Sequence, residues 1–124
     1  MPTRLLRLSR DAEQDILEIL AHSEENFGDV ARRRYEALLF VAMNDIATDP
    51  ERLGSWPRPE IADSIRSYHL VQSRNRVPSG IGLVQRPRHF LLYRIAQPER
   101  VGVGRVLHER MDVLRHIPED YGDT

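Results

Sequence analysis

Apolar side chains recur at helical spacing in two neighbouring segments of the amino-terminal half of this chain. The first runs from about Arg10 to Glu25, and Ser9 just before it predicts a side-chain cap for the free N–H groups of the first turn. The second ends before Pro50, because proline biases the preceding residue away from helix. Between them Gly28 can take a left-handed backbone, and Asp29 is the predicted cap of the second helix. The two segments are therefore predicted to form a helical hairpin.

The pattern changes to that of strands after the helices, where β-branched and aromatic residues fill short runs. The predicted strands cover residues 65–72, 89–96 and 101–108, and a short alternating run over residues 3–8 predicts one more strand ahead of the helices. In the run 89–96, Phe90 and Leu92 point one way while Leu91, Tyr93 and Ile95 point the other. A strand with two apolar faces is predicted to lie in the middle of a sheet.

The loops between these elements are predicted from their glycine and proline residues, which interrupt helices and strands, and from their charged residues. Residues 50–59 contain Gly54 and three prolines and are predicted to form an ordered loop anchored by Trp56. Residues 73–88 are predicted to form a long, basic hairpin tip. A short helix over residues 112–116 is expected near the end, followed by an acidic tail, residues 119–124, that is expected to fray.

This order of elements predicts the fold class. One strand, two helices, three strands and a short helix indicate an α+β domain, with the helical hairpin packed on one face of a mainly antiparallel sheet. At 124 residues the chain is expected to be a single domain, residues 1–124, with a core that needs no disulfide or metal.

The second predicted helix carries more apolar positions than one face can bury. Phe40, Val41 and Met43 lie off the face formed by Leu38 and Ile46. Two explanations stay open: another part of the fold covers this second side, or the side is a partner site, because contiguous exposed apolar surface usually marks binding.

Composition narrows the classes of function. The chain has no cysteine, which excludes a disulfide framework and thiol chemistry. It has neither a signal-like amino terminus nor an apolar run long enough for a membrane span, so the cytoplasm is the expected location. The net charge of −1 argues against a general nucleic-acid binder. All 18 basic residues are arginines, whose planar fork suits carboxylates and phosphates.

The five histidines show none of the familiar spacings of metal ligands. A simple loop between the last two strands would make His89 and His108 cross-strand neighbours, but two imidazoles without a third ligand do not form a catalytic zinc site. No metal and no other cofactor is expected.

Acid–base chemistry on RNA is a second possibility. Histidine titrates near neutral pH, and an arginine can fork onto a phosphate. The residues that could take such roles are Glu60, Arg66, His89, Arg94 and His108. Arg94 and Arg105 are expected on one face of the sheet. There each could equally pair with a carboxylate from the helices or with Glu99 or Glu109 at the ends of the hairpin.

Two stretches resemble a known family. Leu92-Tyr93-Arg94, followed by the run 103–112, VGRVLHERMD, is similar to the closing strands of the ParE branch of the RelE/ParE toxin superfamily. The order of elements across residues 3–118 agrees with that family. The resemblance implies a toxin of a type II toxin–antitoxin system that binds DNA gyrase. It also implies neutralisation by a ParD-like antitoxin in a hetero-oligomer, with DNA contacted only through the antitoxin.

The same superfamily contains ribonucleases, so two alternatives stay open: a RelE-like ribosome-dependent mRNA endoribonuclease, and a toxin fold without toxicity. On the ParE resemblance no catalytic residue is expected. The expected antitoxin contacts are Tyr35, Phe40, Val41, Met43, Arg94 and Arg105. The expected target contacts are Arg74, Arg76, Arg86, Arg88, His108, Arg110 and Met111. The segment 73–88 is longer than the tight hairpin associated with the family.

Overall fold

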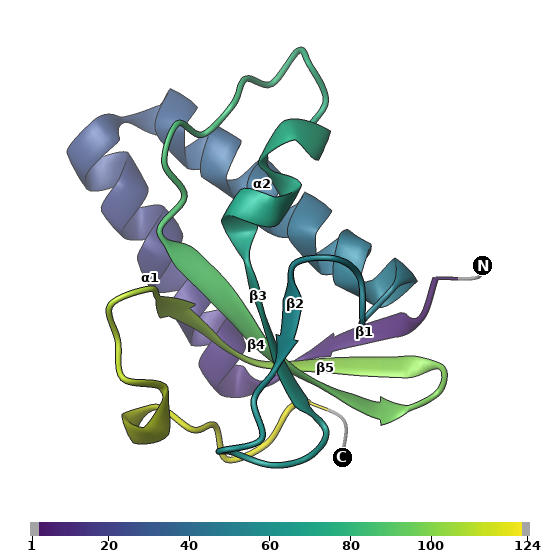
Figure 1. Cartoon of the computed structure of the whole chain (residues 1–124). Helices are drawn as coiled ribbons and strands as arrows, with labels where there is room; N and C mark the ends of the chain where they lie inside the picture. The colour runs from purple at the N-terminus through teal and green to yellow at the C-terminus, as the bar shows by residue number, and fades with distance from the viewer. Residues whose placement is uncertain (1–2, 123–124) are drawn as a thin grey trace.

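The computed structural model describes residues 3–122, which fold into two helices, a five-stranded sheet and two short 3₁₀ helices (Figure 1). The elements are β1 (Leu5–Leu8), α1 (Arg10–Phe27), α2 (Asp29–Thr48), β2 (Ser55–Pro57), β3 (Ile65–His69), η1 (Leu70–Arg76), β4 (His89–Gln97), β5 (Arg100–His108) and η2 (Val113–Arg115). The predicted α+β fold is confirmed, as is the helical hairpin. No helix in this described part is long and apolar enough to cross a membrane.

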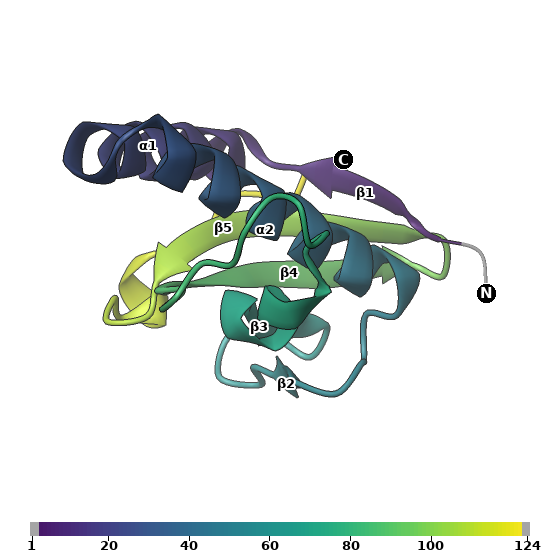
Figure 2. The ribbon, with the colours of Figure 1, turned by 90° about the horizontal axis from the view of Figure 1, so that it is seen from above.

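The sheet has the strand order β1-β5-β4-β3-β2, so β4 lies in its middle as predicted. β2, β3, β4 and β5 pair antiparallel, whereas β1 pairs parallel with β5 through the register Leu5↔Arg100 to Leu8↔Val103. The sheet is therefore mixed, with a single parallel pair. Both helices cover the same face of it, which is clearest when the fold is viewed from above (Figure 2).

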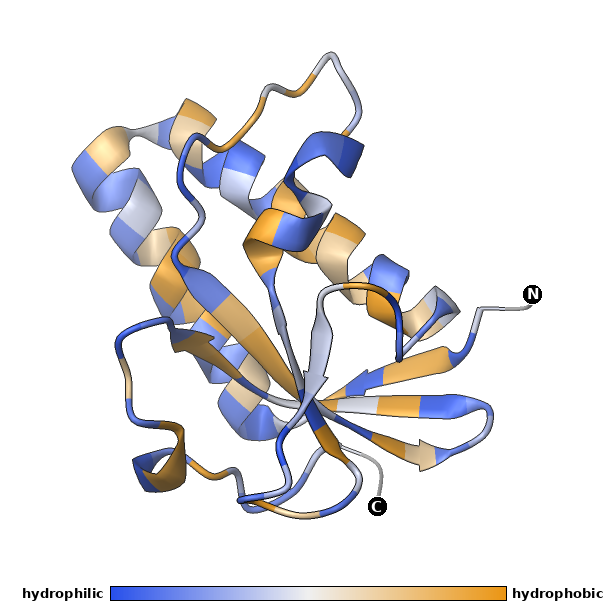
Figure 3. Ribbon diagram, in the orientation of Figure 1, coloured by the Kyte–Doolittle hydropathy of each residue, from blue (hydrophilic) through white to orange (hydrophobic). Residues whose placement is uncertain are grey.

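The two faces of the sheet bury different sets of apolar residues. Apolar residues recur along the neighbouring strands β4 and β5 (Figure 3). Leu91 and Tyr93 of β4 belong to the main core against the helices. Leu92 and its neighbour Phe90 belong to a second cluster on the opposite face. The alternation predicted for β4 is confirmed from Phe90 to Tyr93, whereas Ile95 belongs to neither cluster. The second cluster is closed by the carboxy-terminal segment, which contributes Val113 and Tyr121.

The amino-terminal end of α1 is fixed by Ser9, as predicted. Its hydroxyl oxygen accepts a hydrogen bond from the N–H of Ala12 at 3.0 Å, and the same hydroxyl donates to the carbonyl of Gly104 at 2.6 Å. Ser9 thus caps the helix and ties it to β5. The predicted cap of α2 is wrong: Gly28, with φ +90°, ends α1 and begins α2, and Asp29 is already the first helical residue. One glycine joins the helices, which leaves no separate capping position for Asp29.

Two predictions for the middle of the chain are also wrong in part. Residues 55–57 form the short edge strand β2, and Trp56 is 68% exposed and anchors nothing. The loop is held instead by the hydroxyl of Tyr93, which donates to the carbonyl of Pro50 at 2.5 Å and contacts the hydroxyl of Ser55. The predicted strand 65–72 ends at His69, because its ring accepts a hydrogen bond from the N–H of Val71 at 3.0 Å and caps η1.

The carboxy-terminal segment was expected to fray from residue 119, which is wrong as far as Gly122. The Tyr121 side chain is 5% exposed. It fits against β5 because Gly102 and Gly104 have no side chains: a Cβ on Gly104 would lie 2.6 Å from its ring. The guanidinium of Arg94 lies 4.6 Å from the centre of that ring. Residues 123–124 of the expected tail lie outside the described part.

Candidate functional site

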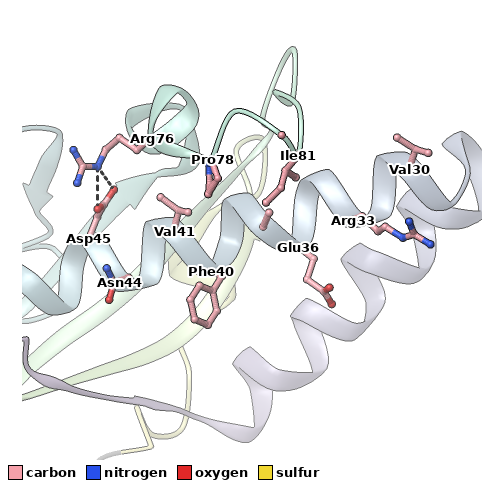
Figure 4. A pocket seen from close by; sticks show the side chains of 12 residues that line it. Val30, Arg33, Glu36, Phe40, Val41, Asn44, Asp45, Arg76, Pro78 and Ile81 are labelled. Carbon is pink, nitrogen blue, oxygen red and sulfur yellow. Dashed lines mark hydrogen bonds and ion pairs between the residues drawn. The ribbon is translucent and has the colours of Figure 1, made fainter.

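An apolar groove runs along α2 and has a volume of about 870 Å³. One wall is α2 itself, and the other is the segment that follows η1 (Figure 4). Its apolar lining consists of Val30, Ala37, Phe40, Val41, Pro78 and Ile81. The lining is completed by Gly80 and by charged and polar residues: Arg33, Glu36, Asn44, Asp45 and Arg76. The groove therefore combines apolar and charged side chains, as protein-binding surfaces do.

Burial along α2 separates the residues that the sequence left ambiguous. Val41 and Met43 pack partly against the main core, so the fold itself covers them in part. Phe40 is 72% exposed and lines the groove. Of the two explanations for the excess of apolar positions, the first accounts for Met43, whereas the surface around Phe40 remains open to a partner.

The far wall of the groove is attached to α2 through a buried carboxylate. Asp45 has a side chain only 4% exposed, and it accepts hydrogen bonds from Ser73 Oγ at 2.6 Å and from Arg76 Nε at 3.0 Å. Arg52 approaches the same carboxylate to 3.3 Å. Arg76 therefore belongs to the groove, and it does not lie with Arg86 and Arg88. Asp45 was not among the predicted site residues, although a charged residue between apolar positions 42 and 46 of a helix is a usable signal.

A second, smaller cleft of about 360 Å³ lies where β3 ends and β4 begins. Its lining residues are His69, Val71, Gln85, Arg86, Pro87, Arg88 and Glu109. The Glu109 carboxylate accepts from His69 Nε2 at 2.8 Å and from Arg88 at 3.1 Å, and these two hydrogen bonds hold its pKa below the ordinary range. Neither His69 nor Glu109 was among the predicted site residues, since their contact joins residues 40 positions apart. Arg74 is turned away and donates to the carbonyl of Val84 at 2.7 Å.

The predicted pairing of His89 with His108 across the hairpin is confirmed, with ring centres 5.3 Å apart. Tyr35 takes part in the same network. Its hydroxyl oxygen accepts from the N–H of Arg88 at 3.1 Å, so its own proton is left to donate to His89 Nδ1 at 2.6 Å. Burial lowers the pKa of His89 to about 4, with a further contribution from His108, and burial raises the pKa of Tyr35 to about 12. His89 is therefore neutral at pH 7, and the Tyr35 hydroxyl is committed inside the fold.

The pKa of His89 predicts acid sensitivity. The unfolded chain binds a proton on this histidine near pH 6.5, whereas the folded protein does so only near pH 4, so unfolding gains protons between these values. Above pH 6.5 the protonation of His89 does not lower the free energy of unfolding. As the pH falls from 6.5 toward 4, proton uptake by the unfolded chain lowers the free energy of unfolding by up to about 3 kcal/mol. We expect His89→Gln to weaken the fall in unfolding free energy over this window, measured by urea denaturation. His22→Gln, at an exposed position on α1, is the control; equal slopes for the two variants would contradict the assignment.

The residues considered for RNA cleavage do not converge. Arg66 donates to the hydroxyl of Ser55 at 2.7 Å and joins β3 to β2. Arg94 lies over Tyr121, on the face opposite the helices. Of the set, His89 and His108 are the pair that the fold brings together. Within residues 3–122, no three histidine or carboxylate side chains gather so that they could hold a metal ion.

The expectation that Arg94 and Arg105 share one face is wrong. Arg105 forms a two-pronged ion pair with Asp15 of α1, with both N–O distances at 2.8 Å. The same carboxylate accepts from the N–H of Val106 at 2.9 Å. The β4–β5 register skips Gly104, between Leu92↔Arg105 and Tyr93↔Val103, and such a bulge breaks the simple alternation of side chains. Arg105 thereby serves to dock α1 on the sheet.

Comparison with known proteins identifies a family. A family model described as the ParE toxin of type II toxin-antitoxin system, parDE, matches residues 6–113. A search of the curated proteins found no match to the chain. The matched residues include both helices, all strands except the first residue of β1, and the lining of the groove and the cleft.

Proposed function

This chain belongs to the ParE toxin family of type II toxin–antitoxin systems, and from that premise we propose that it arrests growth by binding DNA gyrase and is neutralised by a ParD-like antitoxin. The observation that carries the neutralisation half of the proposal is the groove along α2. The target half rests on the family and on the lack of a converging catalytic set among the described candidates.

The groove suits a peptide segment of an antitoxin. The exposed apolar side chains of Phe40 and Ile81 line the groove. Amphipathic helices and extended segments bind such surfaces through spaced apolar anchors. Arg33 and Arg76 on the rim have side chains 73% and 57% exposed. An acidic antitoxin segment would meet these arginines and would associate faster at low salt. The resulting complex is a hetero-oligomer of toxin and antitoxin.

The ribonuclease alternative requires an acid, a base and phosphate-stabilising arginines within reach of one another. Arg66 and Arg94 make contacts elsewhere, and His89 is half-buried and neutral at pH 7. These contacts support a binding protein over a ribonuclease. The third reading, a toxin fold without toxicity, differs from both in producing no growth arrest.

Inducing the chain without its antitoxin separates the three readings. We expect growth arrest, a DNA-damage response and intact messages, together with inhibition of purified gyrase. His89→Gln and His108→Gln are expected to keep this toxicity, because each histidine contributes packing and about one hydrogen bond of roughly 1 kcal/mol. A catalytic histidine would instead lower the rate by about 10²- to 10⁴-fold. His22→Gln serves as the matched control, and antitoxin capture reports folding. Immediate message cleavage that disappears in a folded His108→Gln variant would make the ribonuclease the better reading.

A further inference from the structure

Charge is unevenly distributed along this nearly neutral chain. Residues 64–98 contain six arginines and no aspartate or glutamate. The net charge of −1 thus divides into +6 over this segment and −7 over the rest. The segment supplies β3, η1, β4 and most of the lining of the second cleft. The segment therefore carries an excess of positive charge, and two of its arginines, Arg86 and Arg88, line the second cleft, where they would attract a polyanion.

The cleft already holds an anion, which is the protein's own. Glu109, the first residue after β5, places its carboxylate between a histidine at the end of β3 and an arginine just ahead of β4. The His69 ring accepts from the N–H of Val71 through Nδ1, so Nε2 carries the proton that it donates to Glu109 at 2.8 Å. Two N–H donors from different parts of the fold therefore converge on one oxyanion.

This internal anion is placed where it could be displaced. The Glu109 side chain is 33% exposed, and its carboxylate is held by side chains alone, His69 and Arg88, themselves 27% and 37% exposed. Its main chain is anchored separately, because the N–H of Glu109 donates to the carbonyl of Arg88 at 2.7 Å. Rotation about the side-chain bonds of Glu109 would thus free both donors without moving β5.

We propose that this cleft binds the backbone phosphates of a nucleic acid, and that Glu109 is a resident competitor that swings away when a phosphate enters. The phosphate then accepts from His69 and Arg88, while the exposed Arg86 on the other side of Pro87 reaches a neighbouring phosphate. This inference goes beyond gyrase inhibition and does not depend on it. It also departs from two expectations: the net charge argued against a general nucleic-acid binder, and the family resemblance implied that DNA is contacted only through the antitoxin.

The local arrangement favours a phosphodiester chain over an acidic peptide. A single carboxylate from a partner could only replace the one that Glu109 already provides, with no gain in charge pairing. A backbone with a phosphate at every nucleotide engages several arginines together, and each contact releases a counterion. The arginine fork can take two phosphate oxygens at once, which strengthens each contact.

The test is binding of the purified full-length chain to a labelled single-stranded oligonucleotide at low salt, followed by fluorescence anisotropy. Glu109→Gln keeps the size of the side chain and removes its charge, and we expect it to tighten binding by about tenfold. Arg88→Gln is expected to weaken binding by about tenfold and to reduce its salt dependence. Glu109→Asp, with a carboxylate too short to meet both donors, should lie between wild type and Glu109→Gln.

Two exposed positions provide matched controls for the change in net charge: Glu25→Gln on α1 and Arg7→Gln on β1. If Glu109→Gln binds no more tightly than Glu25→Gln, or Arg88→Gln no more weakly than Arg7→Gln, the proposal is overturned. DNA and RNA of the same sequence form separate arms, and a preference for either identifies the source of the phosphates. A glutamate oligomer that binds as well as the oligonucleotide would assign the cleft to an acidic peptide and reject a nucleic acid. Thermal unfolding of each variant confirms that the chain is folded.

Discussion

Phe40→Asp is expected to abolish capture of the antitoxin while leaving the toxin folded. Phe40 is 72% exposed and lines the groove, so aspartate there removes little buried area from the chain itself. In an interface, an aromatic anchor typically contributes about 2–4 kcal/mol, and an unpaired buried charge adds a penalty. The dissociation constant should therefore rise by at least about 30-fold. Calorimetric titration with the antitoxin measures this directly, and growth rescue in cells should fail in parallel.

The chain provides a close control for this variant. Phe27 is 74% exposed at the end of α1 and lies outside the groove lining. Phe27→Asp makes the same chemical change at the same exposure, so it should bind the antitoxin as the wild type does. Val41 and Met43 are poorer probes, because both pack partly against the core and aspartate there would also test folding. Unchanged antitoxin affinity for Phe40→Asp would remove the groove from the interface.

Asp45→Ala is expected to produce the largest loss of stability among the charged residues discussed. The change leaves Ser73 without its acceptor and leaves Arg52 and Arg76 beside an empty position. Removing one partner of a buried ion pair typically costs about 3–5 kcal/mol. Because the Arg76 side chain is 57% exposed, we expect a loss of about 3 kcal/mol, measured as the unfolding free energy in urea.

Two further variants define how that loss arises. Glu36→Ala removes an exposed carboxylate from the same helix and should change stability by less than about 0.5 kcal/mol. Asp45→Asn keeps an acceptor for Ser73 and loses the charge, so its loss of unfolding free energy should lie between those of Glu36→Ala and Asp45→Ala. Since the same carboxylate holds the far wall of the groove, Asp45→Ala should also weaken antitoxin binding. A loss below about 1 kcal/mol would mean that the arginines find solvent as readily as they find Asp45.

The parts of the fold that follow from local pattern were predictable. Apolar residues at helical spacing predicted α1 and α2, and a capping serine placed the start of α1. The two-sided apolar pattern of β4 predicted its central position. Its pairing with β5 predicted that His89 and His108 would be neighbours. Each of these inferences needs only residues close in sequence or joined by one short turn.

The features that sequence reasoning missed depend on distant contacts or on small departures from regular geometry. A bulge at Gly104 changed the direction of Arg105, and two glycines on β5 made room for Tyr121. Asp45 and Glu109 bind partners 31 and 40 positions away. The hydrophobic pattern can mark a charged residue on an apolar helix face, such as Asp45, but it does not identify the distant residue with which that charge pairs.

The parallel pairing of β1 with β5 also determines the stage of chain synthesis at which the fold can be completed. β1 is made first and its partner strand last, and the docking contacts Ser9–Gly104 and Asp15–Arg105 span 95 and 90 positions. Closing loops of that length is entropically costly and slows folding compared with a purely local topology. The helices can form as soon as they are synthesised, but α1 docks on β5 through Ser9 and Asp15, and β5 is complete only when residues 100–108 are present. The amino-terminal half of a growing chain therefore carries the groove helix before it carries the finished fold.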